Sequence, residues 1–186
     1  MALKNRTKLM FAQELQRMLK SQTLDEIRVV TLCQRCDTIP QTFYYHFHDK
    51  YALVAWNILY DFSVIYGDQV PEYSVDRLTA GLTRIANHQT FYRKVYTDHS
   101  QNAINRCIQQ FNVQNASKAV RASLGDQPFT QDMHTAIAYH TYGMTGLLTE
   151  WLTSDSPLTQ EQLAHFLYTH TPDFLRRAYQ QYAFKN

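Results

Sequence analysis

Apolar side chains recur along this chain at the three- and four-residue spacing of amphipathic helices. Phe11, Leu15, Met18 and Leu19 form the first such stripe, with basic side chains around it. The predicted helices run over about residues 5–21, 28–36, 40–46, 50–66, 101–124 and 130–153, with others beginning near residues 74, 89, 159 and 172. The pattern therefore predicts an all-α fold of eight to ten helices.

Several residues mark where these helices begin. Asp49, Ser74 and Thr130 each precede an apolar stripe and are typical N-cap residues. Thr159 and Gln162 have the spacing of a capping box, in which two side chains satisfy backbone N–H groups reciprocally. These positions fix the expected helix starts more sharply than the apolar stripes do.

The chain divides at residues 67–73, the clearest break in the pattern, which contains Pro71. The segment before it, residues 50–66, is apolar nearly all round, as expected of a helix covered on most sides. We therefore expect a head over residues 1–49, a linking helix over 50–66, and a larger helical bundle over 67–186.

Composition excludes several classes of protein. With 45% hydrophobic and 18% charged residues, the chain is not intrinsically disordered, and five glycines and five prolines are too few for a many-turned β fold. The densest apolar run, residues 51–60, is too short to span a bilayer, and polar residues interrupt any signal-peptide stretch. Three cysteines make a poor disulfide framework. We expect a cytoplasmic protein without membrane contact.

Candidate metal and catalytic chemistry is sparse. Cys33 and Cys36 form a CxxC, but a structural zinc site needs about four ligands and no second CxxC exists, so we interpret both as core thiols. The histidine pairs lack the spacing of an HExxH helix, and GxGxxG and GxSxG motifs are absent. We expect no metal, no cofactor and no enzymatic activity.

The head has the arrangement of a helix-turn-helix: three short helices, with a tight turn at Asp37 and Thr38 between the second and third. In the third helix, Phe43 and Phe47 would face the core. The side chains left facing outward are Gln41, Thr42, Tyr44, Tyr45 and His46. Lys50 opens the next helix, whose free N–H groups favour a phosphate. These side chains suit contacts to DNA phosphates and base edges.

Residues 42–50, Thr-Phe-Tyr-Tyr-His-Phe-His-Asp-Lys, resemble the signature of TetR-family transcriptional regulators, in which Thr-Phe-Tyr-x-His-Phe is followed shortly by Lys. The close resemblance covers about residues 6–60. Residues 142–151 are similar, more weakly, to the C-terminal domain of Firmicutes-type members. The resemblance implies that residues 67–186 bind an effector and dimerise.

The resemblance also implies roles for single residues. Gln41 and Thr42 would face the major groove, whereas phosphates would be held by Tyr44, Tyr45, His46 and Lys50, with help from Arg28 and Thr31. Thr38 and Ile39, just before the third helix, complete the expected DNA-binding set.

Three departures from the family pattern concern this head. Arg28 replaces the usual small polar cap of the second helix, and Asp37 replaces the usual glycine of the turn. Thr38 and Ile39 replace an apolar residue followed by serine. Either Thr38 caps the third helix instead, or the register slips by one residue.

The C-terminal part offers two candidate surfaces. Aromatic residues that could line an effector pocket, or simply pack between helices, are Tyr92, Tyr96, Phe111, Tyr139 and Trp151. The seam of the 130–153 helix suggests packing against a second subunit. The expected dimer residues are Ile137, His140, Met144, Leu147, Phe166 and Leu167. Gly143 and Gly146 would allow close helix approach there, or mark a kink.

These features predict a homodimeric transcriptional regulator that binds a palindromic double-stranded operator and responds to a small-molecule or protein effector. Repression is the commoner mode in the family it resembles. The net charge is only +2, but residues 1–56 carry eight Lys/Arg against five Asp/Glu, a net +3. An alternative keeps the fold but makes the C-terminal half a docking module for a protein partner on which DNA binding depends.

Overall fold

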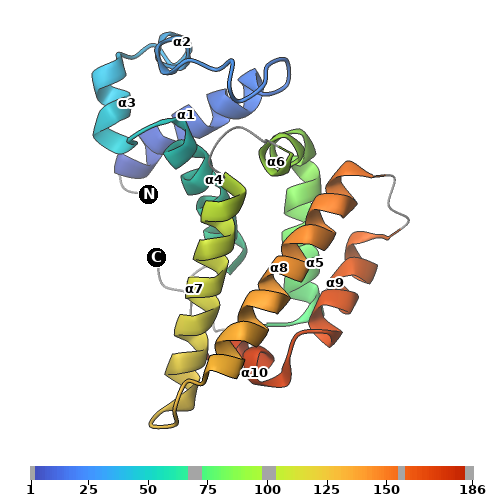
Figure 1. The fold of residues 1–186 in the computed structure, drawn as a ribbon. Helices are drawn as coiled ribbons and strands as arrows, with labels where there is room; N and C mark the ends of the chain where they lie inside the picture. Colours follow the sequence, from blue (N-terminus) through green and yellow to red (C-terminus); the bar gives the residue numbers. More distant parts are fainter. Residues whose placement is uncertain (1–2, 67–72, 98–103, 155–157, 183–186) are drawn as a thin grey trace. The chain divides into compact units, whose positions relative to one another are not determined.

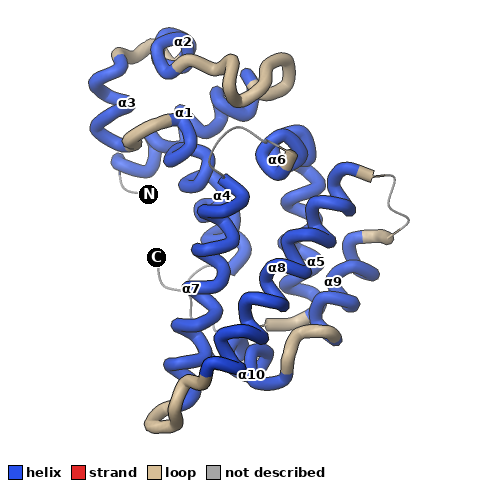
Figure 2. Tube along the Cα trace, viewed as in Figure 1, coloured by secondary structure: helices blue, strands red, loops and turns tan. Residues whose placement is uncertain are grey.

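The computed structural model describes residues 3–66, 73–97, 104–154 and 158–182, and every regular element within these ranges is a helix (Figures 1 and 2). The helices are α1 (Leu3–Met18), α2 (Val29–Arg35), α3 (Pro40–His46), α4 (Lys50–Tyr66), α5 (Val75–Asn87), α6 (Gln89–Tyr96), α7 (Ile104–Leu124), α8 (Gln131–Thr153), α9 (Gln160–Thr169) and α10 (Asp173–Gln181). The all-α prediction is confirmed. The helix expected over residues 5–21 ends earlier, at Met18.

The expected caps are formed. Asp49, Ser74 and Thr130 each accept a hydrogen bond from a backbone N–H in the first turn of the helix that follows. Thr159 and Gln162 form both hydrogen bonds of a capping box at the start of α9. Because each cap satisfies N–H groups that the helix itself leaves unpaired, these side chains fix where α4, α5, α8 and α9 begin.

Contacts divide the chain into two compact units. The head unit comprises residues 1–61 and 88–105, and the body unit comprises residues 62–87 and 106–186. Helices α5 and α6 are separated by His88 alone. Nevertheless α5 belongs to the body unit and α6 to the head unit.

The head unit is built around a row of aromatic rings. The ring of Phe11 on α1 meets that of Phe43 on α3 edge to face, with centroids 5.3 Å apart. Phe43 contacts Phe47 at 5.6 Å, and Phe47 contacts Trp56 on α4 at 6.0 Å. Edge-to-face ring pairs are favourable beyond the apolar area that they bury. This row therefore links α3 and the residue that follows it to both α1 and α4.

Two apolar clusters stand out among the described residues of the body unit. The first joins α5 to α9 and contains Tyr73, Leu78, Leu82, Leu163, Ala164 and Leu167. The second joins α7, α8 and α10 and contains Ala116, Ala119, Val120, Ile137, Leu175 and Ala178. Three of its six buried residues are alanines, two on α7 and one on α10, and such small side chains suit close packing between helices.

Candidate nucleic-acid interface

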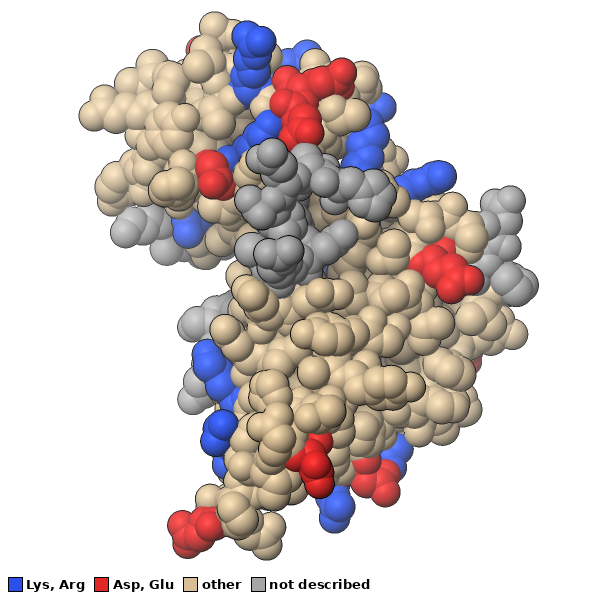
Figure 3. All heavy atoms as spheres, viewed as in Figure 1, with Lys and Arg blue, Asp and Glu red and all other residues tan. Residues whose placement is uncertain are grey.

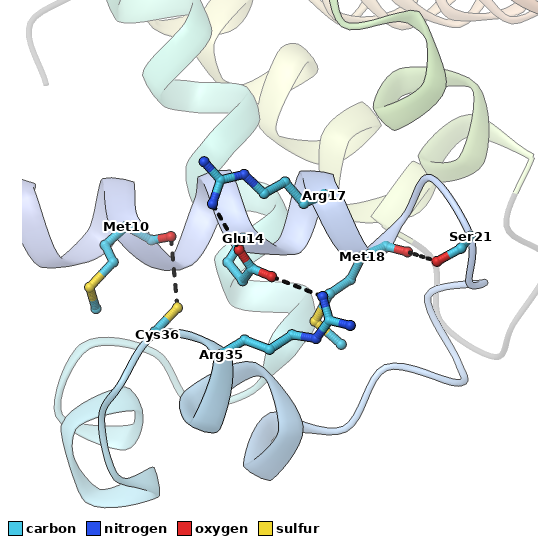
Figure 4. Close-up of polar contacts among 7 residues, drawn as sticks. All are labelled: Met10, Glu14, Arg17, Met18, Ser21, Arg35 and Cys36. Carbon is cyan, nitrogen blue, oxygen red and sulfur yellow. Dashed lines mark hydrogen bonds and ion pairs between the residues drawn. The ribbon is translucent and has the colours of Figure 1, made fainter.

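Glu14 ties α1 to α2. Its carboxylate is largely buried and accepts hydrogen bonds from Arg17 at 3.1 Å and from Arg35 at 3.2 Å (Figure 4). On the same side of α2, the Cys36 thiol lies 3.9 Å from the carbonyl oxygen of Met10. Since Arg35 and Cys36 end α2, these contacts fix the position from which the turn to α3 departs.

The turn between α2 and α3 depends on Asp37. Its φ of 51° lies in the left-handed region, which favours glycine. The chain closes around it through a hydrogen bond from the Thr38 N–H to the Cys33 carbonyl, 3.0 Å. The turn expected at Asp37 and Thr38 is thus present, although an aspartate stands where the family pattern has glycine.

Helix α3 has the bounds expected from the sequence. Ile39 occupies the N-cap position with an extended backbone, and Pro40 is the first helical residue. Thr38 therefore does not cap the helix, and the start of α3 lacks a side-chain cap. Arg28 likewise occupies the N-cap position of α2, and its side chain makes no capping hydrogen bond. Both helix starts therefore lack the usual serine or threonine acceptor, and of the two alternatives for residues 38 and 39 the structure excludes capping by Thr38.

One face of α3 is buried and the other is open. Phe43 is fully buried, whereas Ile39, Tyr44 and Tyr45 are 60%, 58% and 71% exposed. Gln41 and Arg28 are exposed as well. The side chains that are partly exposed are Thr31, Thr38, Thr42, His46 and Lys50. The division into core-facing and outward-facing residues expected for this helix is therefore present in the structure.

Lys50 is engaged in a way that the sequence did not indicate. Its Nζ donates to the carbonyl oxygens of Leu24 at 2.7 Å, Asp25 at 3.0 Å and Ile27 at 3.1 Å. An ammonium has three N–H bonds, so the three carbonyls account for all of them. Lys50 fixes the loop that leads into α2. A phosphate could bind Nζ only if one of these hydrogen bonds broke.

The two cysteines of the CxxC are poorly suited to metal or redox chemistry. Cys33 is fully buried, and burial raises the pKa of its thiol. Burial and the nearby Glu14 carboxylate raise the pKa of Cys36 to about 11. The thiolate form of cysteine is the one that binds metals and forms disulfides. A thiol with a raised pKa has little thiolate at neutral pH. Among the residues that the structure describes, no cluster of His, Cys, Asp and Glu could hold a metal ion.

The residues expected to line an effector pocket differ widely in their surroundings. Tyr92 and Tyr96 are buried within the head unit, where the Tyr92 hydroxyl donates to Asp61 at 2.8 Å and burial raises the pKa of Tyr96 to about 12. Phe111 is exposed, and Tyr139 is 82% exposed, so Tyr139 lines no enclosed pocket in this structure. Trp151 is partly exposed and packs beside the first body cluster.

The residues expected at a dimer interface fall into a buried group and an exposed group. Ile137 and Leu167 are buried in the two body clusters, and Met144 packs against the first, so these side chains serve the chain's own core. His140 is partly buried. Leu147 and Phe166 remain exposed. The 4-3-4 spacing mainly followed the core-facing side of α8. Beside it lies an open stripe that comprises Tyr139, Tyr142, Gly143, Gly146 and Leu147, of which the spacing included Leu147 alone.

Charged side chains form no single basic patch on the face of the molecule that Figure 3 shows. On the face shown in Figure 3, Lys and Arg side chains alternate with Asp and Glu and do not gather into one patch. A protein that coats nucleic acid without regard to sequence normally carries a large basic surface. The exposed face of α3 therefore stands out for its tyrosines and its amide, and not for its charge.

Comparison with known proteins agrees with this architecture. A family model described as the C-terminal region of TetR-type transcriptional regulators matches residues 77–173, more than half of the chain. The chain belongs to the TetR family of transcriptional regulators. The family assignment expected from the sequence is thereby confirmed through a part of the chain other than the motif of residues 42–50, and the chain is a regulator and not an enzyme.

A solved structure of this class has the same fold. The dihydroxyacetone kinase operon activator DhaS superposes with a TM-score of 0.60, covering 88% of this chain and 92% of its own, at 18% sequence identity. No curated protein sequence matches the chain. In the described part of this TetR-family chain, no helix is both long and apolar enough to cross a membrane.

Proposed function

We propose that this TetR-family regulator is a cytoplasmic homodimer that binds a palindromic DNA operator through α3 and represses transcription until an effector binds its C-terminal part. The observation that carries the proposal is the open face of α3. It presents Gln41, Tyr44 and Tyr45 to solvent, directly after a left-handed turn at Asp37. Here α2 and α3 would form the helix-turn-helix. The later helix of such a motif, α3 in this chain, lies in the major groove, where side chains of these types contact phosphates and base edges.

The modest charge of the head shapes how it would bind. Residues 1–56 carry a net +3, and a dimer doubles this, so phosphate attraction gives a salt-dependent but limited affinity. Tyrosine hydroxyls and backbone N–H groups would supply the remaining phosphate contacts. A large part of the affinity would therefore depend on the correct sequence.

The open stripe of α8 supports dimerisation. Gly143 and Gly146 lie one turn apart on the exposed side, and a Cβ added to either would meet nothing within 4 Å. Neither glycine is needed for packing within the chain, and α8 continues as a helix through both. Tyr139, Tyr142 and Leu147 border them and are exposed apolar groups. A helix from a second subunit could approach closely here and cover these side chains.

DNA binding is tested with the purified full-length chain and the promoter region of its own gene. Binding should weaken as salt increases. Gln41→Ala should cost about 1–3 kcal/mol on the preferred site and relax its specificity. Tyr44→Phe should weaken all sequences alike, because it removes a phosphate contact. Gln131→Ala, an exposed glutamine at the start of α8, is the matched control and should change nothing. Absence of binding at low salt would refute the proposal.

Dimerisation is tested separately by analytical ultracentrifugation. Tyr142→Glu should shift the chain toward monomer, because the carboxylate would be buried opposite a second copy of the same apolar stripe. Gln131→Glu places the same charge on an exposed position of the same helix and should leave the dimer intact. A monomeric wild-type chain that still binds a palindrome tightly would remove dimerisation from the proposal.

The alternative, in which DNA binding depends on a docked protein partner, arose from the unusual residues at positions 37–39. The turn and α3 are nevertheless formed with these residues in place. This observation favours a head that is competent by itself. Tight operator binding by the purified chain alone would eliminate the dependent mode.

A further inference from the structure

We propose that α3 reads A·T base pairs, with Ile39 packing on a thymine 5-methyl group and Gln41 bonding an adenine. This inference rests on the proposed DNA binding and names the base pairs that the site selects. It comes from the exposed side chains of α3 and from the residue types that this helix lacks.

Helix α3 and its N-cap residue contain no arginine, lysine, aspartate or glutamate; their sequence is Ile-Pro-Gln-Thr-Phe-Tyr-Tyr-His over residues 39–46. In the major groove, guanine is read chiefly by arginine or lysine, and cytosine N4 by aspartate or glutamate. The recognition helix therefore lacks the groups that usually read a G·C pair.

Ile39 is an exposed aliphatic residue at the N-cap position of α3, where a polar residue is usual. It is 60% exposed, with an extended backbone and a side chain that cannot cap the helix. A serine or asparagine there would stabilise α3 by satisfying a backbone N–H. The first residues of a recognition helix reach base edges, and an aliphatic side chain at that point meets only one apolar group on them, the thymine methyl.

Gln41 complements Ile39. It is exposed and follows Ile39 by two residues, within the first turn of α3. The glutamine amide can bond adenine N6 and N7 together, an arrangement that no other base offers. Tyr44 and Tyr45 lie further along the helix, where their hydroxyls suit phosphates. Each half-site would thus contain an A·T pair, recognised by Ile39 through the thymine methyl group and by Gln41 through the adenine edge.

The test starts from an operator selected from random-sequence DNA with the purified full-length chain. Each thymine of the half-site is replaced singly by deoxyuridine, which removes only the 5-methyl group, and affinity is measured by fluorescence anisotropy. At one thymine per half-site, the substitution should weaken binding about fourfold. This is the change in affinity that corresponds to the burial free energy of one methylene group. Replacing an adenine by 7-deazaadenine should weaken wild type but not Gln41→Ala.

Variants locate the contact on Ile39. Ile39→Ala should bind thymine and deoxyuridine operators equally, and Ile39→Val should retain part of the difference. Val64→Ala removes a similarly exposed β-branched side chain from α4 and should keep the full fourfold difference. Circular dichroism of each variant establishes that it is folded.

Two results would overturn the inference while leaving DNA binding intact: essential half-site positions that are all G·C, or a methyl effect that persists in Ile39→Ala. A chain that selects no sequence at all would refute the proposed function itself. The two failures are therefore distinguishable.

Discussion

Lys94 on α6 donates a hydrogen bond from Nζ to the backbone carbonyl of Gln22, 2.6 Å away, in the loop between α1 and α2. Lys50 bonds three further carbonyls of the same loop. Two ammonium groups from different helices therefore hold residues 22–27, the segment that leads into α2. Lys94 lies within the region that the C-terminal family model matches, yet α6 belongs to the head unit.

Replacing Lys94 by methionine should loosen the loop without disturbing α6. Methionine keeps much of the aliphatic length but cannot donate to the Gln22 carbonyl, and hydrogen bonds from charged groups contribute about 1.5–3 kcal/mol. We expect faster amide hydrogen exchange over residues 22–28 and weaker binding to all DNA sequences. Arg93→Met, the adjacent exposed residue on α6, removes the same charge and should leave the loop protected. Equal exchange in both variants would show that the hydrogen bond is unimportant.

Asp37 should be replaceable by glycine with a gain in stability. Its φ of 51° costs an L-amino acid about 1–2 kcal/mol, and aspartate tolerates this region better than most residues. We expect Asp37→Gly to raise the free energy of unfolding by up to about 1 kcal/mol and Asp37→Ala to lower it. Urea denaturation measures both, and Asp37→Asn controls for loss of the charge. A destabilised glycine variant would mean that the Asp37 side chain itself stabilises the turn.

Glu14 should contribute to the stability of the fold by holding α2 against α1, although its two arginine partners are largely exposed. Glu14→Gln removes the charge that Arg17 and Arg35 share, and we expect a loss of about 1–3 kcal/mol on urea denaturation. Arg35→Met should be costlier than Arg17→Met, because only Arg35 links α1 to another helix. Glu161→Gln on α9, an exposed glutamate, is the control. The reverse order of the two arginine variants would contradict this account of the link.

Local signals predicted the helices well. Asp49, Thr130 and the pair Thr159 and Gln162 marked helix starts because a cap acts within one turn, so the sequence alone contains both partners. The bounds of α3 followed in the same way from Pro40, whose ring suits a first helical position.

Contacts between distant residues were not predictable in this way. Lys50 was expected to face a phosphate, but the carbonyls that engage it belong to a loop more than 20 residues earlier. On α8, both the core seam and the open stripe contain apolar residues, so periodicity could not decide which of Ile137 and Tyr139 faces outward. That choice depends on α7 and α10, which cover Ile137 and leave Tyr139 exposed.

His140 is a partly buried titratable group that affects the stability of the body unit near neutral pH. Its Nε2 lies 3.5 Å from the Thr171 hydroxyl, which in turn hydrogen-bonds the Tyr73 hydroxyl at 2.8 Å. These contacts connect α8 with the segment between α9 and α10 and with the segment that leads into α5. Burial lowers the pKa of His140 below its ordinary value of 6.5 and raises that of Tyr73, so both groups are neutral in the folded chain at neutral pH.

This shift predicts acid sensitivity with a definite sign. Below pH 6.5 the unfolded chain protonates His140 more readily than the folded chain does, so the unfolded state gains protons and stability falls as pH decreases. One group changes the free energy of unfolding by at most about 1.4 kcal/mol per pH unit. The carboxyls of Glu26 and Asp49, whose pKa values are lowered from 4.5 and 3.8, contribute only at lower pH.

Urea denaturation at pH 7.5, 6.5 and 5.5 should therefore show a decline for wild type that His140→Gln flattens. His165→Gln changes an exposed histidine on α9 and should keep the wild-type decline. Because glutamine can still hydrogen-bond Thr171, a uniform loss of stability in His140→Gln would indicate a packing defect, whereas a changed slope isolates the proton. A decline of equal slope in wild type and in His140→Gln would show that protonation elsewhere, and not that of the His140 imidazole, makes the fold sensitive to acid.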